Sequence, residues 1–283
     1  MALPAYAGTG ERVWYYSYRV ICALIFLFLI VPIIVIVPLS FNARPYFTFT
    51  QGMLALDPSA YSLRWYDALF SSREWMNSIR NSFFIATSSA LISTALGTLA
   101  ALGLSRPQMP ARAFITAILI SPMIVPLIIT AAALFSFYAR LNLANTFFSI
   151  IMAHVVLGTP FVVITVTASL SGFDQQLIRA AQSLGANQVT TFFKVILPLL
   201  LPGVIAGGLF AFITSLDEVV VVLFLAGPEQ TPMTVRMFSG LREEISPTIL
   251  ALASILVAIS ILLLTSMEFL RRRNERQRGI SQT

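Results

Sequence analysis

The chain has 283 residues, of which 57% are hydrophobic and 11% are charged, and its formal net charge is +6 at pH 7. Soluble domains carry about 25% charged residues, so this composition excludes a soluble globular protein and indicates an integral membrane protein. The mean hydropathy of +0.84 agrees with that class. Much of the positive charge lies beside apolar runs, where it anchors a membrane protein. We therefore expect membrane lipid as a partner and no nucleic acid.

Apolar runs long enough to cross a bilayer recur along the chain. A helix needs roughly 20 mostly apolar residues to span the hydrocarbon. Unbroken apolar runs favour helices over a barrel, whose strands would alternate in polarity. We therefore predict an all-α polytopic membrane protein with about six transmembrane helices, in a single domain over residues 1–283. The expected spans are residues 20–39, 81–104, 113–137, 147–170, 202–225 and 249–270.

The arginines beside these spans predict the orientation of the chain, because positively charged flanks stay in the cytoplasm. The cytoplasmic segments expected on this basis are residues 1–19, the loop at residues 171–198 and the basic tail at residues 271–283. Arg106 and Arg112 mark a further cytoplasmic connection, between the second and third spans. Both termini are therefore predicted to be cytoplasmic.

Small residues and prolines predict how the spans pack and bend. Small residues at helical spacing allow two membrane helices to approach closely. The small residues concerned are Gly97, Ala101, Ala206, Gly207 and Gly208. Pro122 and Pro126 predict a bend at the start of the third span. The sole histidine, His154, lies within the fourth span and is predicted to be buried and hydrogen-bonded.

A possible docking surface lies in the connection between the first and second spans. Trp65, Tyr66, Leu69 and Phe70 fall on roughly one helical face. Aromatic residues gather at membrane interfaces, so this face is interpreted either as part of an interfacial belt or as a surface for an external partner.

The loop at residues 171–198 contains a helix in two parts. Asp174 can cap the first part, and Leu177, Ile178, Ala181 and Leu184 form a narrow apolar stripe along it. Gly185 suits the left-handed position that ends a helix. Asn187 can start a second helix, which continues through Pro198 into the fifth span. The stripe either docks into the groove of a partner or lies on the membrane surface.

Two adjacent acidic residues lie inside the fifth span. A bare charge in the membrane costs several kcal/mol, so Asp217 and Glu218 are candidates for a functional or paired role. Three interpretations remain: the pair lines a polar path, it is a structural pair, or it couples an ion gradient in a secondary transporter.

No motif in the sequence indicates an enzyme. A phosphate-binding loop requires Gly-Lys-Ser/Thr, and the only lysine, Lys194, lies in "FFKVI". A single histidine excludes a metal site built from several histidines. We expect no catalytic, cofactor or metal site, so the energy for any transport must come from another subunit or from an ion gradient.

The segment "RAAQSLGANQVTTFFKVILP" resembles the cytoplasmic signature of the inner-membrane permeases of ABC importers, which reads E-A-A, three residues, G, nine residues, I-x-L-P. The matching positions are Ala180, Ala181, Gly185, Leu197 and Pro198. Val195 replaces the isoleucine, and Arg179 replaces the glutamate. The substitution at Arg179 puts in doubt any polar contact that the glutamate makes to the ATPase in relatives.

This resemblance implies a bacterial inner-membrane importer of several subunits. Such an importer contains two permeases, two ATP-binding subunits that use the ATP, and an external solute-binding protein. The split helix would be the coupling helix, which transmits closure of the ATPase subunits to the spans. The residues that would carry ATPase coupling are Arg179, Ala180, Ala181, Leu184, Gly185, Ala186 and Pro198.

The stretches "LRWYDALF" and "SLDEVVVVLFLAGPEQTPMTVRMFSGLREEISPTILALAS" resemble the spermidine/putrescine branch of these permeases. The implied substrate is a polyamine, and a cationic amine would be favoured by acidic residues that face the path or its outer mouth, namely Asp217, Glu218, Glu243 and Glu244. Related permeases also serve opines or other amine-containing solutes, so these remain alternatives.

Overall fold

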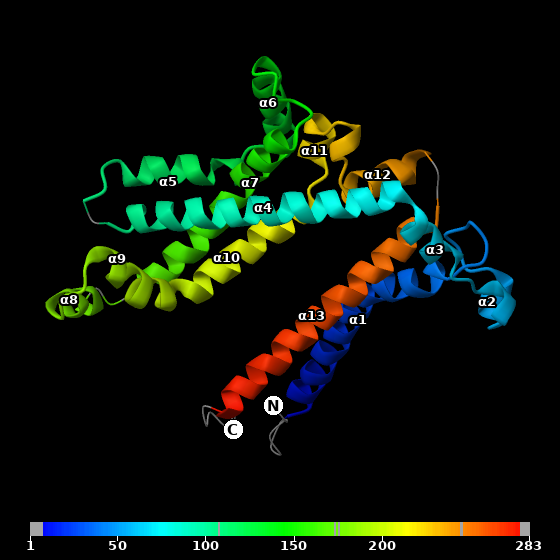
Figure 1. Ribbon diagram of the computed structural model, residues 1–283. Coiled ribbons are helices and arrows are strands. Elements are labelled where there is room, and N and C mark those ends of the chain that lie inside the picture. Colours follow the sequence, from blue (N-terminus) through cyan, green and yellow to red (C-terminus); the bar gives the residue numbers. More distant parts are fainter. Residues whose placement is uncertain (1–7, 107, 173, 175, 244–245, 278–283) are drawn as a thin grey trace. The chain divides into compact units, whose positions relative to one another are not determined.

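The computed structural model describes residues 8–106, 108–172, 174, 176–243 and 246–277 (Figure 1). The apolar runs form helices, as predicted, and no strand occurs among these residues. The chain divides into two compact units, one made of Met1–Ser72 with Gly240–Thr283 and the other of Arg73–Ser239. The prediction of a single domain remains a prediction.

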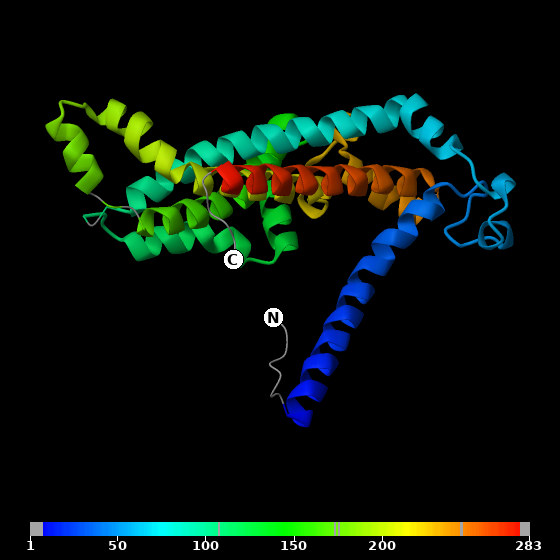
Figure 2. The ribbon, with the colours of Figure 1, turned by 90° about the horizontal axis from the view of Figure 1, so that it is seen from below.

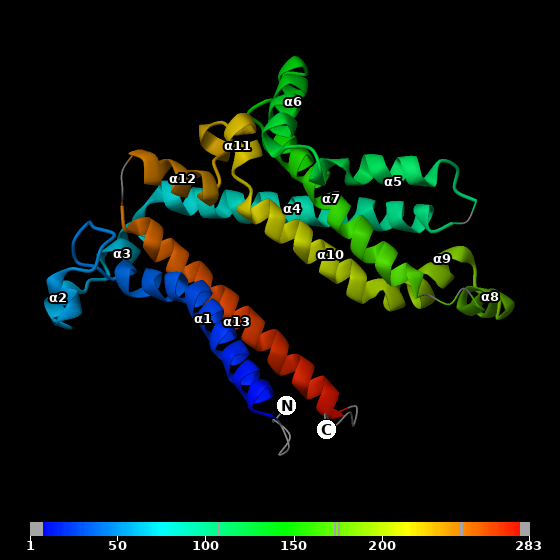
Figure 3. The same ribbon diagram turned by 180° about the vertical axis from the view of Figure 1, so that it is seen from behind.

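The unit Arg73–Ser239 is built around three helices that pack side by side. These are α4 (Arg73–Leu104), α7 (Phe147–Ser171) and α10 (Leu197–Asp217), and Figure 3 shows them from behind. The other elements of this unit are α5 (Arg112–Ile120), α6 (Leu127–Arg140), α8 (Gln176–Ser183), α9 (Gln188–Thr191), α11 (Val220–Leu225) and the first part of α12 (Met233–Glu243).

Glycines allow the three central helices to approach closely. A Cβ atom added at Gly97 of α4 would lie 2.6 Å from the Cβ atom of Val162 on α7. A Cβ atom added at Gly207 of α10 would lie 2.8 Å from the Cα atom of the same valine. Ala101 and Ala211 are buried in the adjoining core. The predicted small-residue contacts are therefore confirmed at these positions.

The third expected span is broken. The segments Arg112–Met123 and Leu127–Arg140 meet at an angle of 99°. Pro122 and Pro126 lack the N–H groups that would continue the helix, and the N–H groups of Ile124 and Val125 both donate to the carbonyl of Ser121. The predicted bend is thus present as a sharp break, because the helix ends at this turn and a new one starts after Pro126.

Four helices are long and apolar enough to cross a membrane among the described residues, and the broken pair would make a fifth if it forms one span. The sixth expected span corresponds to α13 (Thr248–Gln277), of which Thr248–Leu262 is apolar. The all-α polytopic fold is confirmed, and the count of six spans stays a prediction.

The other unit contains α1 (Thr9–Ser40), α2 (Gln51–Leu54), α3 (Arg64–Ser71) and α13. Figure 2 shows that α1 and α13 meet near α3 and diverge toward their other ends. Trp65 Nε1 donates to the carbonyl of Asn42 at 2.7 Å, and Tyr66 shares a 2.7 Å hydrogen bond with Ser40. Leu69 is fully buried. Three members of the predicted aromatic face therefore pack within their own unit, whereas Phe70 is exposed.

Candidate functional site

The split helix begins as its sequence predicts. The Oδ1 atom of Asp174 accepts a hydrogen bond from the N–H group of Gln176 at 2.8 Å. This bond satisfies one of the backbone donors that the first turn of a helix leaves unpaired. Asp174 therefore fixes the start of α8.

Gly185 ends α8 in the left-handed conformation, with φ of 83°. The N–H group of Ala186 donates to the carbonyl of Ala181 at 3.0 Å, which is the closing bond of a Schellman turn. No heavy atom lies within 4 Å of a Cβ atom added at Gly185. The need for glycine here is confirmed, and it comes from the backbone conformation alone.

The chain then runs directly into a membrane-crossing helix. Asn187 caps α9 by accepting a hydrogen bond from the N–H group of Thr190 at 2.8 Å. A π-helical turn, Phe192–Ile196, joins α9 to α10, and Pro198 lies in the first turn of α10. The whole segment Gln188–Asp217 forms one candidate span. Only Leu184 to Asn187 thus separate α8 from this candidate span.

The residues of the apolar stripe predicted on α8 differ in exposure. Leu184 is 89% exposed and Leu177 is 43% exposed, so both are available to a partner. Ile178 and Ala181 are half-buried. The other predicted coupling residues differ in exposure as follows: Arg179, Ala180, Gly185 and Pro198 are exposed, and Ala186 is half-buried.

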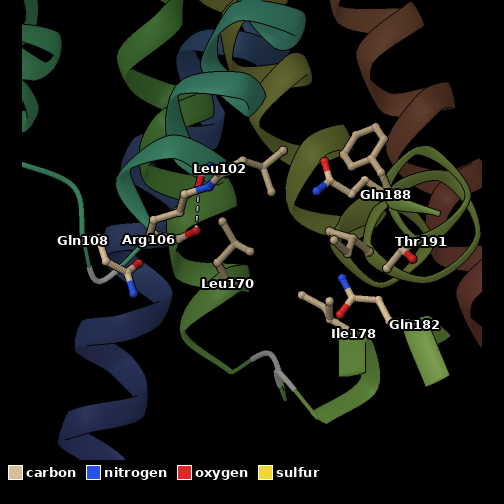
Figure 4. A pocket seen from close by; sticks show the side chains of 11 residues that line it. Leu102, Arg106, Gln108, Leu170, Ile178, Gln182, Gln188 and Thr191 are labelled. Atoms are coloured by element: carbon tan, nitrogen blue, oxygen red, sulfur yellow. Dashed lines mark hydrogen bonds between the residues drawn. The ribbon is translucent and has the colours of Figure 1, made fainter. Parts of the chain in front are cut away.

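A cavity of about 630 Å³ lies between α8 and the adjoining ends of the bundle helices (Figure 4). Figure 4 shows Arg106 and Gln108 on one side and Gln182 and Gln188 on the other, with Leu170 between them. The remaining lining residues are Leu102, Ser105, Ile178, Thr191, Phe192 and Ile196. This cavity was not predicted from the sequence, although Gln182 follows Ile178 by one helical turn and so shares its face.

The two acidic residues of the fifth expected span have different environments. Helix α10 ends at Asp217, and α11 begins two residues after Glu218. Glu218 is only 8% exposed, and its carboxylate accepts a hydrogen bond from the N–H group of Val221 at 2.9 Å. Asp217 is exposed on the surface of its unit. The expected single span is therefore broken at a buried capping residue, and the two carboxylates differ in exposure.

The segment that faces Glu218 is itself tied to α4. Thr234 of α12 donates to the carbonyl of Glu218 at 3.2 Å, and Ser82 of α4 accepts from the N–H group of Met233 at 2.8 Å. Arg236 forms an ion pair with Glu74 at 2.6 Å. Within the described residues this is the one ion pair, so the carboxylate of Glu218 is satisfied by backbone and not by a cation.

The buried histidine is hydrogen-bonded as predicted. The Nδ1 atom of His154 lies 2.6 Å from the Oγ atom of Ser215, which joins α7 to α10. In the part of the chain that the structure covers, no group of three or more His, Cys, Asp or Glu side chains could hold a metal ion. His154 is thus a contact between two central helices.

Comparisons with known proteins agree on one family. The family described as binding-protein-dependent transport system inner membrane component matches residues 93–276. The chain is 32% identical over 250 residues to the spermidine/putrescine transport system permease protein PotC of Haemophilus influenzae. The aligned region covers 88% of this chain and 94% of the relative. It is 30% identical over 266 residues to the putrescine transport system permease protein PotI of Escherichia coli, with 92% of each chain covered.

A solved structure has the same fold. It comes from a bacterial ABC transporter involved in the import of the acidic polysaccharide alginate, and it matches with a TM-score of 0.72 at 17% identity. The match covers 95% of this chain and 99% of that chain. A second structure of a bacterial alginate ABC transporter, in complex with an alginate pentasaccharide-bound periplasmic protein, matches with a TM-score of 0.63 at 17% identity and covers 91% of this chain and 93% of that chain.

Proposed function

Because the chain belongs to the family of binding-protein-dependent transport system inner membrane components and is the membrane permease of an ABC importer, we propose that it carries a polyamine such as spermidine or putrescine. It forms half of the translocation path. The second half is a homologous permease, and two ATP-binding subunits supply the energy on the cytoplasmic side, where both termini lie. A solute-binding protein delivers the polyamine from outside.

The exposed carboxylate of Asp217 is the observation that carries the substrate proposal. It lies at the end of α10, on a helix whose other residues are mostly apolar. A charge facing lipid near the bilayer centre costs about 2.5–3.5 kcal/mol, so this carboxylate faces water or another chain. An ammonium group at 4 Å gains about 4 kcal/mol at an effective dielectric constant of about 20. Asp217 therefore favours a cationic solute in the path.

The PotC and PotI relatives support the same substrate class, since their names assign them to spermidine and putrescine transport. Glu218 has a supporting role in this proposal. Its carboxylate holds the start of α11 and so fixes the break that exposes Asp217. The substrate path is thus assigned to Asp217, with Glu218 as a positioning residue.

Helix α8 serves as the coupling helix in this proposal. Leu184 and Leu177 present apolar side chains that fit the groove of an ATP-binding subunit. The short turn at Gly185 connects them to the candidate span Gln188–Asp217. A displacement of α8 on closure of the ATPase subunits would therefore be passed to the helix that carries Asp217. Arg179, in place of the usual glutamate, lies on the exposed surface of α8.

Two alternatives make different predictions. A secondary transporter would use Asp217 or Glu218 to couple an ion gradient, and its transport would persist without ATP. Membership of a binding-protein-dependent family argues against that mechanism. An ABC permease for an opine or an amino-acid derivative would keep the ATP requirement and differ only in the solute that is transported.

The test is ATP-dependent uptake of labelled spermidine by the complete importer in vesicles. Asp217→Asn should reduce uptake about tenfold, which corresponds to about 1.4 kcal/mol, while the complex stays assembled and spermidine binding to the external protein is unchanged. Glu218→Gln is the matched control, because its amide oxygen can still accept the hydrogen bond from Val221. Normal uptake by Asp217→Asn would refute the role of this residue, and uptake driven by a gradient without ATP would refute the importer mechanism.

A further inference from the structure

The cavity behind α8 has the chemistry of an anion site. Arg106 is the one charged residue among those that line it. Across the described part of the chain, the ion pair recorded joins Arg236 and Glu74, so no carboxylate neutralises Arg106 there. The cavity therefore has a positive wall and no acidic group to compete with a bound anion.

Amide groups complete the polar half of the cavity. Gln108, Gln182 and Gln188 each carry two N–H donors. The hydroxyl groups of Ser105 and Thr191 donate instead to the backbone carbonyls of Leu102 and Asn187. Figure 4 shows Arg106 with Gln108 on one side of the open space and Gln182 with Gln188 on the other. A bound oxyanion can thus meet donors from both sides.

The rest of the cavity wall is apolar. It is formed by Leu102, Leu170, Ile178, Phe192 and Ile196. The volume of about 630 Å³ falls in the range of about 300–1,000 Å³ that is usual for small-ligand sites. One charged pole, several amide donors and an apolar wall suit a phosphate group attached to a glycerol or acyl chain.

We propose that this cavity binds a net-anionic phosphate ester, with Arg106 as its cation and Gln182 and Gln188 as hydrogen-bond donors. The shared chemistry belongs to an anionic phospholipid headgroup of the cytoplasmic leaflet and to a soluble glycerol phosphate. Basic pockets at the cytoplasmic ends of membrane helices bind such headgroups.

The site lies where a ligand can act on coupling, and this consequence rests on the proposed role of α8. Ile178 and Gln182 on α8 form one wall, and Leu102 and Leu170 at the ends of α4 and α7 form another. Leu184, directly after α8, does not line the cavity and is exposed. A ligand that binds better to one position of α8 shifts the population of that position. The bound phosphate would therefore change how strongly the ATPase responds to solute.

The experiment uses the complete importer in nanodiscs of neutral phosphatidylcholine, with a photoactivatable phosphatidylglycerol whose attachment sites are mapped by mass spectrometry. Attachment is expected at residues 102–108 and 178–196. Arg106→Gln should weaken it about tenfold, as for loss of a hydrogen bond to a charged group. Gln182→Leu keeps the bulk, removes the amide N–H donors of this side chain and should weaken attachment by a smaller factor. Arg112→Gln removes the same charge from the same connection but does not line the cavity, so it is the matched control.

Competition by glycerol phosphate separates the two sources of phosphate. If it displaces the lipid, the site accepts the soluble ester, and if it does not, the site requires the lipid; either result supports the proposal. Absence of attachment at these residues, or equal loss in Arg106→Gln and Arg112→Gln, would overturn it. Solute-stimulated ATP hydrolysis is measured on the same samples. If attachment depends on Arg106 but hydrolysis does not respond to the lipid, the binding site is supported and only its link to coupling is refuted.

Discussion

Gly97 lies between two packed helices, whereas Gly185 lies at the end of a short helix with open space around it. At Gly97 the backbone is an ordinary helix, and a side chain would collide with Val162. At Gly185 a side chain would collide with nothing, and the left-handed backbone alone excludes it. Both positions need glycine, but for different physical reasons.

Because of this difference, substitutions at Gly97 should affect the stability of the unit, whereas substitutions at Gly185 should affect coupling to the ATPase. The contact at Gly97 belongs to the core of α4, α7 and α10, so its loss acts on the whole unit. The turn at Gly185 has no tertiary contact to lose, so its change acts on the direction of α8 relative to α9. Substitutions at the two sites should therefore fail in different assays.

The largest expected effect is the loss of stability in Gly97→Ala. Overpacking of a tight core costs about 1–3 kcal/mol, and here the added methyl group would lie 2.6 Å from the Cβ atom of Val162. The thermal unfolding temperature of the purified protein in detergent should fall. Because the Cβ atom of Val162 is itself in the way, Val162→Ala should not restore the stability fully.

Gly103→Ala is the matched control, because Gly103 lies on the same helix and a Cβ atom there has no neighbour within 4 Å. Alanine favours a helix over glycine by roughly 0.5–1 kcal/mol, so this variant should be as stable as the wild type or slightly more stable. Equal destabilisation by both substitutions would show that close packing is not the reason for Gly97.

The next largest effect is the loss of coupling in Gly185→Val. A left-handed conformation costs an L-residue about 1–2 kcal/mol, and a β-branched side chain makes it worse. The turn should straighten, and Leu184 should move away from the ATPase groove. We expect reduced co-purification of the ATP-binding subunit, or hydrolysis that no longer responds to solute, with normal membrane insertion and thermal stability.

Three further variants sharpen this result. Gly185→Asn should be tolerated better, since asparagine adopts the left-handed region more readily. Gly172→Val should have little effect, because Gly172 has φ of −94° and also lies in open space. Arg179→Glu restores the residue usual in the family and should be tolerated. Normal co-purification and normal stimulation in Gly185→Val would refute the coupling-helix assignment.

The sequence predicted the features that depend on neighbouring residues. The break after α8 could be found because Gly185 and Asn187 are local signals whose geometry does not depend on distant contacts. The small residues of α4 and α10 predicted close packing as well. They could not reveal that Val162 on α7 faces both Gly97 and Gly207, since that contact depends on how three helices assemble.

The features that the sequence missed depend on tertiary contacts. The break between α10 and α11 precedes an apolar run without glycine or proline, and its local signal is Glu218, whose carboxylate accepts from the N–H group of Val221 three residues later. The break depends on the buried carboxylate and on Thr234, which comes from a later part of the chain. Likewise Pro122 and Pro126 predicted a bend, but not its angle of 99° or the packing of α6 with α11. The cavity at Arg106 also combines segments far apart in sequence.

The smallest expected effect is that of removing the cap of α9. It tests whether fraying at the turn between α8 and α9 stays outside α10. The N–H group of Thr190 has no helical acceptor within the first turn and donates to the side chain of Asn187. Asn187→Ala removes this acceptor and costs about 1 kcal/mol, whereas Asn187→Asp keeps it. Because α9 continues through the π-helical turn into α10, fraying should stop before the membrane-crossing part.

Hydrogen exchange measured on the intact importer distinguishes this outcome. The amide of Thr190 should exchange about five times faster in Asn187→Ala, as expected for about 1 kcal/mol, with no change in the amides of α10. The response of hydrolysis to solute should fall less than in Gly185→Val, because Gly185 still sets the direction of α8. Faster exchange along α10 would mean that the turn and the span unfold together, and the distinction between a local turn and a packed core would then fail at this segment.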